Sequence, residues 1–281
     1  MNLSPLRLKA FENDGFIAPI RLISRDQARL LRGIGENLLS ESDQCARYEL
    51  TDPIRFHAVT DSEGWTEFSY DPDQESSPHT FGFLFNVWKI NESFRRVAFS
   101  REIADIAREL LGSQRILLME DNVVMKAPGT KRLPWHQDYS YWPLSEPAAV
   151  TAWIALEDID ASNGSMEVAP GTQNLGERLP VWFGDGTSFM HQYRPGIPDV
   201  PQNVHEKGPT SIYKLSPGEG GFHHSLLWHG STANESDQAR YAYVLRYVTE
   251  GTVWLGSRRF PYDDIGCAPG EPLTTDHFPI V

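Results

Sequence analysis

Two side chains that can bind a metal ion, His136 and Asp138, stand two positions apart in the segment WHQDYSYW. Side chains alternate along an extended strand, so residues two apart are expected to project from the same face. An imidazole nitrogen and a carboxylate oxygen placed in this way can chelate one ion. Taken alone, a His-x-Asp pair is a weak signal, because it arises often by chance and then marks an exposed turn.

A third candidate ligand lies in the segment GGFHHSLLWHGSTANESDQARYAY, where three of the nine histidines fall within seven residues. His229 is expected at the end of an apolar strand, from which its ring can reach into a barrel mouth; alone, it is more often a core histidine. Together, two histidines and one carboxylate on a β scaffold match the facial triad of non-haem iron(II) oxygenases. Such a triad leaves positions open for a 2-oxo acid and dioxygen.

Arg240 follows His229 by eleven residues, on the apolar strand RYAYVLRY. A guanidinium inside a barrel requires an anion, because burying it unpaired is costly. The distal carboxylate of 2-oxoglutarate suits this role, bound bidentately; the alternative is a surface salt bridge. Zinc would suit the same three ligands, but a hydrolytic zinc site needs a partner acid or base that the sequence does not identify.

Two helices are expected ahead of these motifs. The first runs from about Ser24 to Leu39, because Ser24 and Gln27 have the form of a capping box and apolar residues then recur at helical spacing. The second runs from about Glu92 to Leu111, with Gly112 as its stop. The polar stretch over residues 60–80 is punctuated by Gly, Pro and Asp and is expected to be a loop.

After Gly112 the sequence changes to short apolar runs rich in β-branched and aromatic residues, separated by turn residues. This pattern predicts a mainly β fold with flanking helices, a double-stranded β-helix (jelly roll, cupin-like). One domain is expected over 1–281, with a helical part over about 1–112 and the jelly-roll core over about 113–281. A Pro- and Gly-rich stretch over about 174–210, with several aromatics, is expected to form a lid over the pocket mouth.

The bulk composition narrows the partners. A net charge of −13 repels a phosphate backbone, so no nucleic-acid partner is expected. No stretch approaches the ~20 apolar residues of a membrane span, and no signal peptide opens the chain. Two cysteines, Cys45 and Cys267, cannot form a disulfide framework, which fits a reducing cytoplasm as the expected location.

The chain resembles the phytanoyl-CoA dioxygenase family of iron(II)/2-oxoglutarate oxygenases over most of its length. FENDGFIAPIRLIS is similar to the family's opening Phe-x-x-x-Gly-Phe, and MKAPGTKRLPWHQD has the family's Lys, Pro and Gly ahead of His-x-Asp. The segments AWIALEDIDASNGSMEVAPGTQ and WHGSTANESDQAR are also similar, including the spacing from histidine to arginine. One position departs from the family: Gln173 stands where a histidine is usual, outside the triad.

The resemblance implies roles for individual residues. It implies iron(II) ligation by the triad of His136, Asp138 and His229, and binding of the 2-oxoglutarate C5 carboxylate by Arg240 and Ser231. Trp153 would line the co-substrate pocket and Asn122 would contact it; each could equally be structural, Trp153 as plain core. Four further residues are candidates for the substrate side, with ordinary packing as the alternative: His223, Tyr139, Tyr141 and Trp142.

The expected activity is therefore oxidation of an unactivated carbon in a small-molecule substrate. Iron(II) is the expected metal, 2-oxoglutarate and dioxygen are the expected co-substrates, and succinate and carbon dioxide are released. A small polar or natural-product substrate is favoured, because no CoA-binding motif is evident. Two alternatives stay open: a non-catalytic jelly-roll module that binds a metal or ligand, and a metal-dependent hydrolase. Succinate release would distinguish the oxygenase from the binding module, and activity without oxygen would identify the hydrolase.

Overall fold

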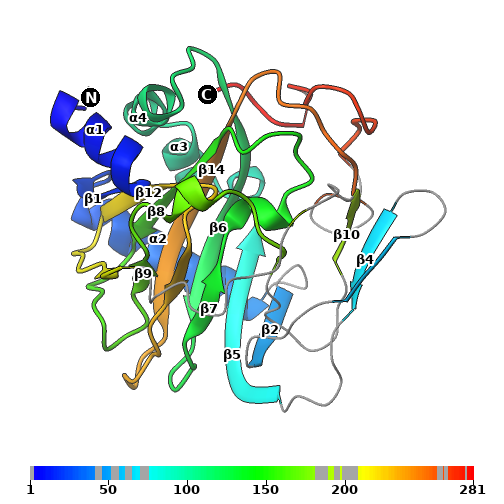
Figure 1. Ribbon diagram of the computed structural model, residues 1–281. Helices are drawn as coiled ribbons and strands as arrows, with labels where there is room; N and C mark the ends of the chain where they lie inside the picture. The colour runs from blue at the N-terminus through cyan, green and yellow to red at the C-terminus, as the bar shows by residue number, and fades with distance from the viewer. Residues whose placement is uncertain are drawn as a thin grey trace.

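Two antiparallel sheets and a layer of helices make up the computed structural model, which describes residues 3–41, 46–51, 57–60, 65–69, 76–180, 189–192, 197, 208–257, 262, 265–275 and 277–281. The larger sheet has seven strands in the order β1-β12-β8-β14-β6-β5-β2, and the smaller has four in the order β11-β9-β13-β7. The helices lie along the larger sheet (Figure 1). The predicted jelly roll therefore takes the form of two sheets with helices outside one of them.

The strands of the larger sheet come from distant parts of the chain, including the N-terminal part that was expected to be helical. In spatial order they are β1 Phe16–Arg21, β12 Glu219–His224, β8 Ala149–Ala155, β14 Arg240–Thr249, β6 Ile116–Lys126, β5 Ser76–Phe85 and β2 Ala46–Thr51. The smaller sheet consists of β11 Ser211–Ile212, β9 Met166–Val168, β13 His229–Ser231 and β7 Leu133–His136. A separate three-stranded sheet contains β10 Phe189–Gln192, β4 Trp65–Ser69 and β3 His57–Thr60.

Local sequence signals explain where the helices begin and end. Helix α2 (Arg25–Glu41) starts at the predicted capping box, in which the Gln27 amide donates to Ser24 Oγ and the Ser24 amide donates to Gln27 Oε1. An additional helix, α1 (Pro5–Asp14), was not predicted. It has Ser4 as N-cap and ends at Gly15, whose φ of 78° suits a glycine.

The second predicted helix is in fact two helices, α3 (Glu92–Ala98) and α4 (Arg101–Leu111). The break falls at Ser100, whose extended backbone and side-chain oxygen cap the first turn of α4. The apolar residues recur at helical spacing throughout this stretch, but Ser100 acts as an N-cap, so a second helix begins there. The predicted stop at Gly112 is confirmed, with φ of 61°.

The loop predicted over residues 60–80 is wrong where the structure describes it, because β4 and the start of β5 lie there. Pairing with other strands overrode weak local propensity. Most of the predicted lid over 174–210 lies outside the described residues. Its beginning contains the 3-10 helix η3 (Thr172–Leu175), and β10 within it pairs with β4.

Alternation along β14 divides its side chains between two cores. Tyr241, Tyr243, Leu245 and Tyr247 belong to the core beneath the helices. Ala242 and Val244 belong to the core between the two sheets. Arg240 is two residues before Ala242, and Arg246 two residues after Val244, so both belong to the inner face of the strand. The strand therefore carries the predicted Arg240, and in addition the unpredicted Arg246, on the inner face of the jelly roll.

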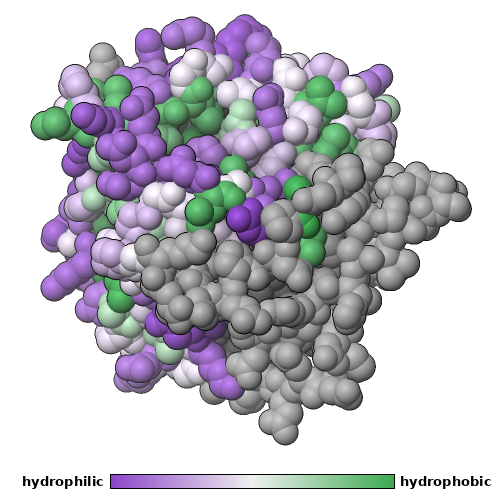
Figure 2. All heavy atoms as spheres, viewed as in Figure 1, coloured by the Kyte–Doolittle hydropathy of each residue, from purple (hydrophilic) through white to green (hydrophobic). Residues whose placement is uncertain are grey.

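The surface is mixed in character. On the face shown in Figure 2, hydrophobic residues lie scattered among hydrophilic ones over the part that is coloured. Individual exposed apolar side chains such as Leu6 and Leu30 occur on the helices. Within the described ranges, no helix is long and apolar enough to cross a membrane.

Candidate functional site

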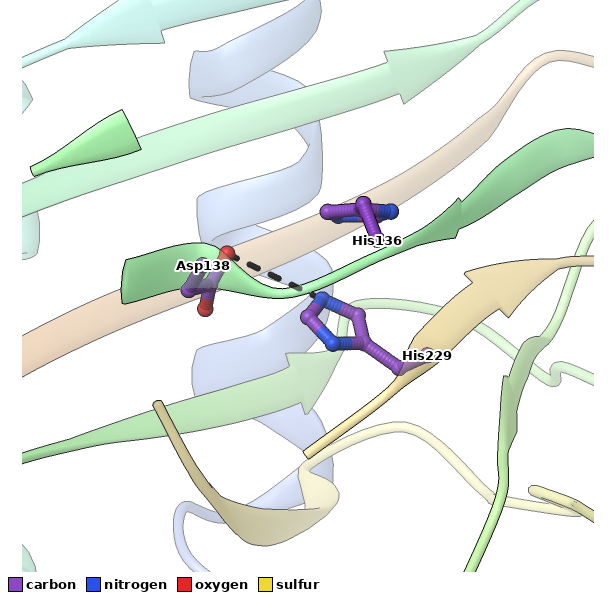
Figure 3. A group of neighbouring side chains, drawn as sticks. All are labelled: His136, Asp138 and His229. Carbon is purple, nitrogen blue, oxygen red and sulfur yellow. Dashed lines mark ion pairs between the residues drawn. The ribbon is translucent and has the colours of Figure 1, made fainter. Parts of the chain in front are cut away.

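His136, Asp138 and His229 meet inside the jelly roll (Figure 3). One potential ligand atom from each residue lies within 4.8 Å of the other two, and all three residues are buried. His229 Nε2 is 3.7 Å from Asp138 Oδ1, and the two histidine ring centroids are 4.2 Å apart. The structure thus assembles the three residues that the sequence proposed as a triad.

Strand pairing brings these residues together in a way that differs from the prediction. His136 is the last residue of β7 and pairs directly with His229, the first residue of β13. Asp138 lies beyond the strand, at the start of the 3-10 helix η2 (Asp138–Tyr141). The expectation that one strand includes both His136 and Asp138 is therefore wrong. The backbone is still extended at Gln137 and enters the 3-10 helix at Asp138, whose carboxylate nevertheless lies close to both histidines.

Hydrogen bonds fix the tautomer of each triad histidine. His136 Nδ1 is 2.8 Å from the Pro134 carbonyl, and His229 Nδ1 is 2.9 Å from the Leu227 carbonyl. A carbonyl oxygen only accepts, so each Nδ1 carries the hydrogen and each Nε2 keeps a lone pair. Burial lowers the pKa of His136 to about 4 and that of His229 well below its usual value. Both rings are therefore neutral near pH 7, as metal ligation requires.

A row of side chains on the larger sheet surrounds the Asp138 carboxylate. Thr151 Oγ1 donates to Oδ2 at 2.7 Å, and His223 Nε2 lies 3.2 Å from the same oxygen. Arg246 Nη2 is 3.6 Å from Oδ1. Burial alone would raise the pKa of Asp138, but the Arg246 charge and then the nearby histidines hold it well below its usual value. The carboxylate is therefore charged, with Oδ2 already occupied by two donors.

The same row could not be seen in the sequence. His223 on β12 pairs with Thr151 on β8, which pairs with Arg246 on β14, which pairs with Glu120 on β6. Arg246 Nη1 donates to Glu120 Oε1 at 2.7 Å. Thr151 and Arg246 were missed because their role depends on cross-strand register. Sequence spacing alone gives no such register.

Arg240, the first residue of β14, is 2% exposed and lines the same cavity as the triad. Its Nη2 donates to the Gly164 carbonyl at 2.8 Å, whereas Nε and Nη1 have no hydrogen-bond partner among the described residues. Its guanidinium lies over the Trp153 ring, 5.3 Å from the centroid. Burial lowers the pKa of Arg240 to about 10, so the group remains charged at neutral pH. A buried cation with two free donors calls for an anion.

Ser231 and Trp153 line this cavity as predicted. Ser231 Oγ accepts a hydrogen bond of 2.8 Å from Lys126, a fully buried lysine that the sequence reading left unassigned. The available signal was the Lys of MKAPG, which pairs with Arg240 across β6 and β14. The apolar part of the cavity wall includes Phe83, Val124, Leu133, Trp153, Met166 and Val244.

Two predicted contacts fall elsewhere. Asn122 is buried but is not part of the cavity wall, and its Oδ1 accepts from Arg246. Tyr139 packs in a hydrophobic cluster with the C-terminal segment, and its hydroxyl donates to the Leu144 carbonyl. Trp142 belongs to the same cluster, but the guanidinium of Arg246 lies over its ring, 5.7 Å from the centroid. Tyr141 does adjoin the triad, because its ring meets the His136 ring edge-on at 6.1 Å.

His223, one of the predicted substrate-side residues, does reach the site. It lies on β12, which ends at His224, whereas β13 begins only at His229. The centroid of its ring is 4.5 Å from that of the His229 ring, and its Nε2 contacts Asp138. His224 is not part of the triad, and its Nδ1 accepts from the Leu226 amide.

Two glutamines tie the site to its surroundings. Gln137, between the two ligands of the His-x-Asp motif, donates to the Gly176 and Leu226 carbonyls and accepts from the Arg178 amide. It thereby joins the triad to the start of the segment that was predicted to be a lid. Gln173, the departure from the family pattern, donates to the carbonyls of Glu12 and Asn13 at the end of α1.

Comparisons with known proteins identify a family model and sequence relatives. The family model for phytanoyl-CoA dioxygenase (PhyH) matches residues 11–242. A peroxisomal phytanoyl-CoA dioxygenase of Bos taurus is 34% identical over 254 residues, 85% of this chain and 67% of the relative. A probable phytanoyl-CoA dioxygenase of Caenorhabditis elegans is 30% identical over 158 residues, 53% of this chain, and the chain spans about half (48%) of that relative.

Among solved structures, the fold is similar to that of the epimerase SnoN in complex with Fe3+, alpha ketoglutarate and nogalamycin RO. The TM-score is 0.70 at 21% identity, and the match covers 98% of this chain and 97% of SnoN. The likeness confirms the predicted mainly β jelly roll with flanking helices.

Proposed function

The chain belongs to the phytanoyl-CoA dioxygenase family, and on this premise we propose that it hydroxylates or otherwise oxidises an unactivated carbon of a small-molecule substrate. Family membership confirms the predicted enzyme class, a 2-oxoglutarate-dependent non-haem iron dioxygenase, and the predicted iron(II), 2-oxoglutarate and dioxygen. One observation carries the proposal further. A single cavity is lined by two buried histidines, a buried carboxylate and a buried guanidinium, two of whose donors have no partner among the described residues.

The three ligands fit a divalent metal. Two neutral imidazoles present Nε2 lone pairs, and a charged carboxylate lies between them and the larger sheet. His229 Nε2 and Asp138 Oδ1 are 3.7 Å apart and both are electron-pair donors, so a cation between them removes their repulsion. Because Thr151 and His223 already donate to Oδ2, Oδ1 is the oxygen left to bind the metal. Two histidines and one carboxylate favour iron(II) with open positions.

The part of the cavity wall formed by Arg240 and Ser231 fits the distal carboxylate of 2-oxoglutarate. Arg240 supplies the free Nε and Nη1 donors, and Ser231 lines the cavity beside it. A guanidinium edge presents two parallel N–H groups that match a carboxylate. Trp153, which lies beneath the guanidinium, limits the directions that this side chain can take. Binding at Arg240 leaves the 2-oxo acid end of the co-substrate for the metal.

Bound iron with 2-oxoglutarate supplies the oxidising chemistry, in which the co-substrate leaves as succinate and carbon dioxide. The chain's own residues bind, orient and exclude water. His136 and His229 keep their lone pairs directed inward through fixed Nδ1 hydrogen bonds, and Arg246 opposes neutralisation of Asp138. Burial of all three ligands and of Arg240 keeps bulk water from the reacting atoms.

A small polar or natural-product substrate is proposed. The cavity wall combines apolar side chains with the His223 and Arg246 side of the metal site, which suits a molecule with both characters. SnoN, whose fold is similar, was crystallised with the natural product nogalamycin RO. The net charge of −13 disfavours nucleic acid as a substrate.

The test is turnover with candidate small molecules in the presence of iron(II), ascorbate and 2-oxoglutarate. Succinate formation that depends on oxygen, together with a product one oxygen heavier or two hydrogens lighter, is the expected result. Substrate conversion without oxygen would identify a hydrolase instead. Tight metal and 2-oxoglutarate binding with no succinate under any condition would identify a binding module.

A further inference from the structure

Lys126 is a buried amine placed between the two strands that form the proposed co-substrate site. It is 0% exposed, and its Nζ donates to Ser231 Oγ at 2.8 Å and to the Thr232 carbonyl. It also stands opposite Arg240 in the pairing of β6 with β14. The lysine therefore contacts one residue of the proposed carboxylate site and is the cross-strand neighbour of the other.

Gly164 shows that this arrangement is closely packed. A Cβ added at Gly164 would lie 2.7 Å from Lys126 Cδ, and the φ of 87° at this position also favours glycine. The Gly164 carbonyl accepts the one hydrogen bond described for the Arg240 side chain. Gly164 thus leaves space for the aliphatic part of the Lys126 side chain and accepts a hydrogen bond from Arg240.

The surroundings of the amine favour its neutral form before an anion binds. Burial, and after it the charges of Arg240 and Arg132, lower the pKa of Lys126 to about 6. Those arginines adjoin the carboxylates of Glu157 and Glu167, respectively. A neutral amine has two N–H groups, which match the two acceptors that it contacts.

The hydrogen bond from Lys126 decides how Ser231 is oriented. A hydroxyl group has one hydrogen to donate, and its oxygen accepts from elsewhere. Because Ser231 Oγ accepts from Lys126, the Ser231 hydrogen remains available to donate to a different group. Ser231 lines the cavity with Arg240, so that hydrogen has an anion to meet when a carboxylate binds there.

We propose that Lys126 is a positioning residue for the distal carboxylate of 2-oxoglutarate. The Lys126 amine donates to Ser231 Oγ, and the serine hydroxyl in turn donates its hydrogen to the carboxylate bound by Arg240. The proposal rests on the function proposed above.

A double-mutant cycle tests this relay on the manganese(II)-loaded protein, which binds without turnover. The variants are Lys126→Met, Ser231→Ala and the pair, and the ligands are N-oxalylglycine, which has the distal carboxylate, and oxamate, which lacks it. Each single variant should weaken N-oxalylglycine binding roughly ten- to a hundredfold, the usual range for a hydrogen bond to a charged group. Lys126→Met should add little in the Ser231→Ala background. Oxamate binding should not change.

Equal weakening of both ligands by Lys126→Met, or full additivity with Ser231→Ala, would overturn the relay. Manganese stoichiometry and thermal melting report whether each variant is folded. Should Lys126→Met not fold, Lys126→Gln takes its place in the cycle, because its side chain is one atom shorter and cannot make the 2.8 Å hydrogen bond to Ser231 Oγ. The same two results would then contradict the proposal. Loss of the proposed function itself would look different, because the wild-type protein would bind neither ligand.

Discussion

Polar atoms that line the cavity differ in whether the protein satisfies them. The Nδ1 atoms of His136 and His229 and the Oδ2 of Asp138 have protein partners. Among the described residues, Nε and Nη1 of Arg240 have none. Buried polar groups are nearly always satisfied, so these two donors mark where an anion belongs. The proposed co-substrate site follows from them.

Arg240 gives the first prediction. Arg240→Met should weaken 2-oxoglutarate binding by ~2–5 kcal/mol, as expected when one partner of a buried charge pair is removed. Iron binding should survive, because the triad is untouched. The ligand-free variant should melt at or above the wild-type temperature, since a buried cation with two unsatisfied donors is destabilising.

Arg96 provides the matched control. It lies exposed on α3 and pairs with Glu92, so Arg96→Ala should leave 2-oxoglutarate affinity unchanged. Equilibrium titration of both variants with 2-oxoglutarate and thermal melting of the ligand-free proteins give the comparison. Unchanged affinity in Arg240→Met would mean that the anion binds elsewhere.

Residue type and spacing predicted four central side chains, namely His136, Asp138, His229 and Arg240. Lys126, Thr151 and Arg246 could not be predicted, because each acquires its role from the residue opposite it on a neighbouring strand. Asn122 and Tyr139 were named from position in a motif, and their side chains turn out to have other partners. Short motifs indicate candidate ligands, but they do not show which residues pair across neighbouring strands.

Strands and turns position these residues differently from simple alternation. β7 ends at His136 and a 3-10 turn carries Asp138, so a regular strand through both would have been incorrect. The break between α3 and α4 at Ser100 and the strands in residues 60–80 were likewise missed. In each case a turn or a long-range pairing determined the local structure, and neither is encoded by periodicity over a few residues.

Gly230 supplies a prediction about these strands. A Cβ there would lie 2.6 Å from the Leu133 carbonyl oxygen and 3.2 Å from that of Pro134, both backbone atoms of β7 or its start. Gly230→Ala should therefore separate β13 from β7, which pair through His229 and His136. Iron affinity should fall at least tenfold, and the free energy of unfolding by ~1–3 kcal/mol. Metal titration and denaturant unfolding measure the two effects.

Gly33 in α2 is the control, because nothing lies within 4 Å of a Cβ added there. Gly33→Ala should stabilise the protein by up to ~1 kcal/mol through helix propensity, with iron affinity unchanged. If Gly230→Ala behaved like Gly33→Ala, the close approach of β13 to β7 would not be needed to hold the ligands.

At the scale of the molecule, Asp121 links the helical layer to the larger sheet. Its Oδ2 accepts from the Trp88 amide at 3.0 Å and from the Tyr243 hydroxyl at 2.5 Å. Burial raises the pKa of Asp121 to about 7 from its ordinary 3.8, against the opposing effect of those hydrogen bonds. A carboxyl group whose pKa is raised on folding stabilises the folded state when protonated. That contribution is complete below about pH 4 and is lost as the pH rises through about 7.

Asp121→Asn should remove this dependence, because the amide keeps an accepting oxygen and never ionises. From pH 4 to pH 8, the unfolding free energy of the variant should rise relative to the wild-type value, by up to ~4 kcal/mol for a three-unit shift. Urea unfolding of the metal-free proteins at several pH values measures the difference, in which all other titrating groups are shared. A constant difference across that range would show that Asp121 is ionised in the folded protein.

The jelly roll as a whole places the proposed metal site beside the proposed anion site. Anaerobic titration with iron(II) and 2-oxoglutarate tests this most directly, because chelation of iron(II) by a 2-oxo acid gives visible charge-transfer absorption. The wild-type protein should develop this absorption at one iron and one 2-oxoglutarate per chain, and His229→Ala, left with two ligands, should not. Absorption that is absent from the wild-type protein, or unchanged in His229→Ala, would contradict the assignment of the site.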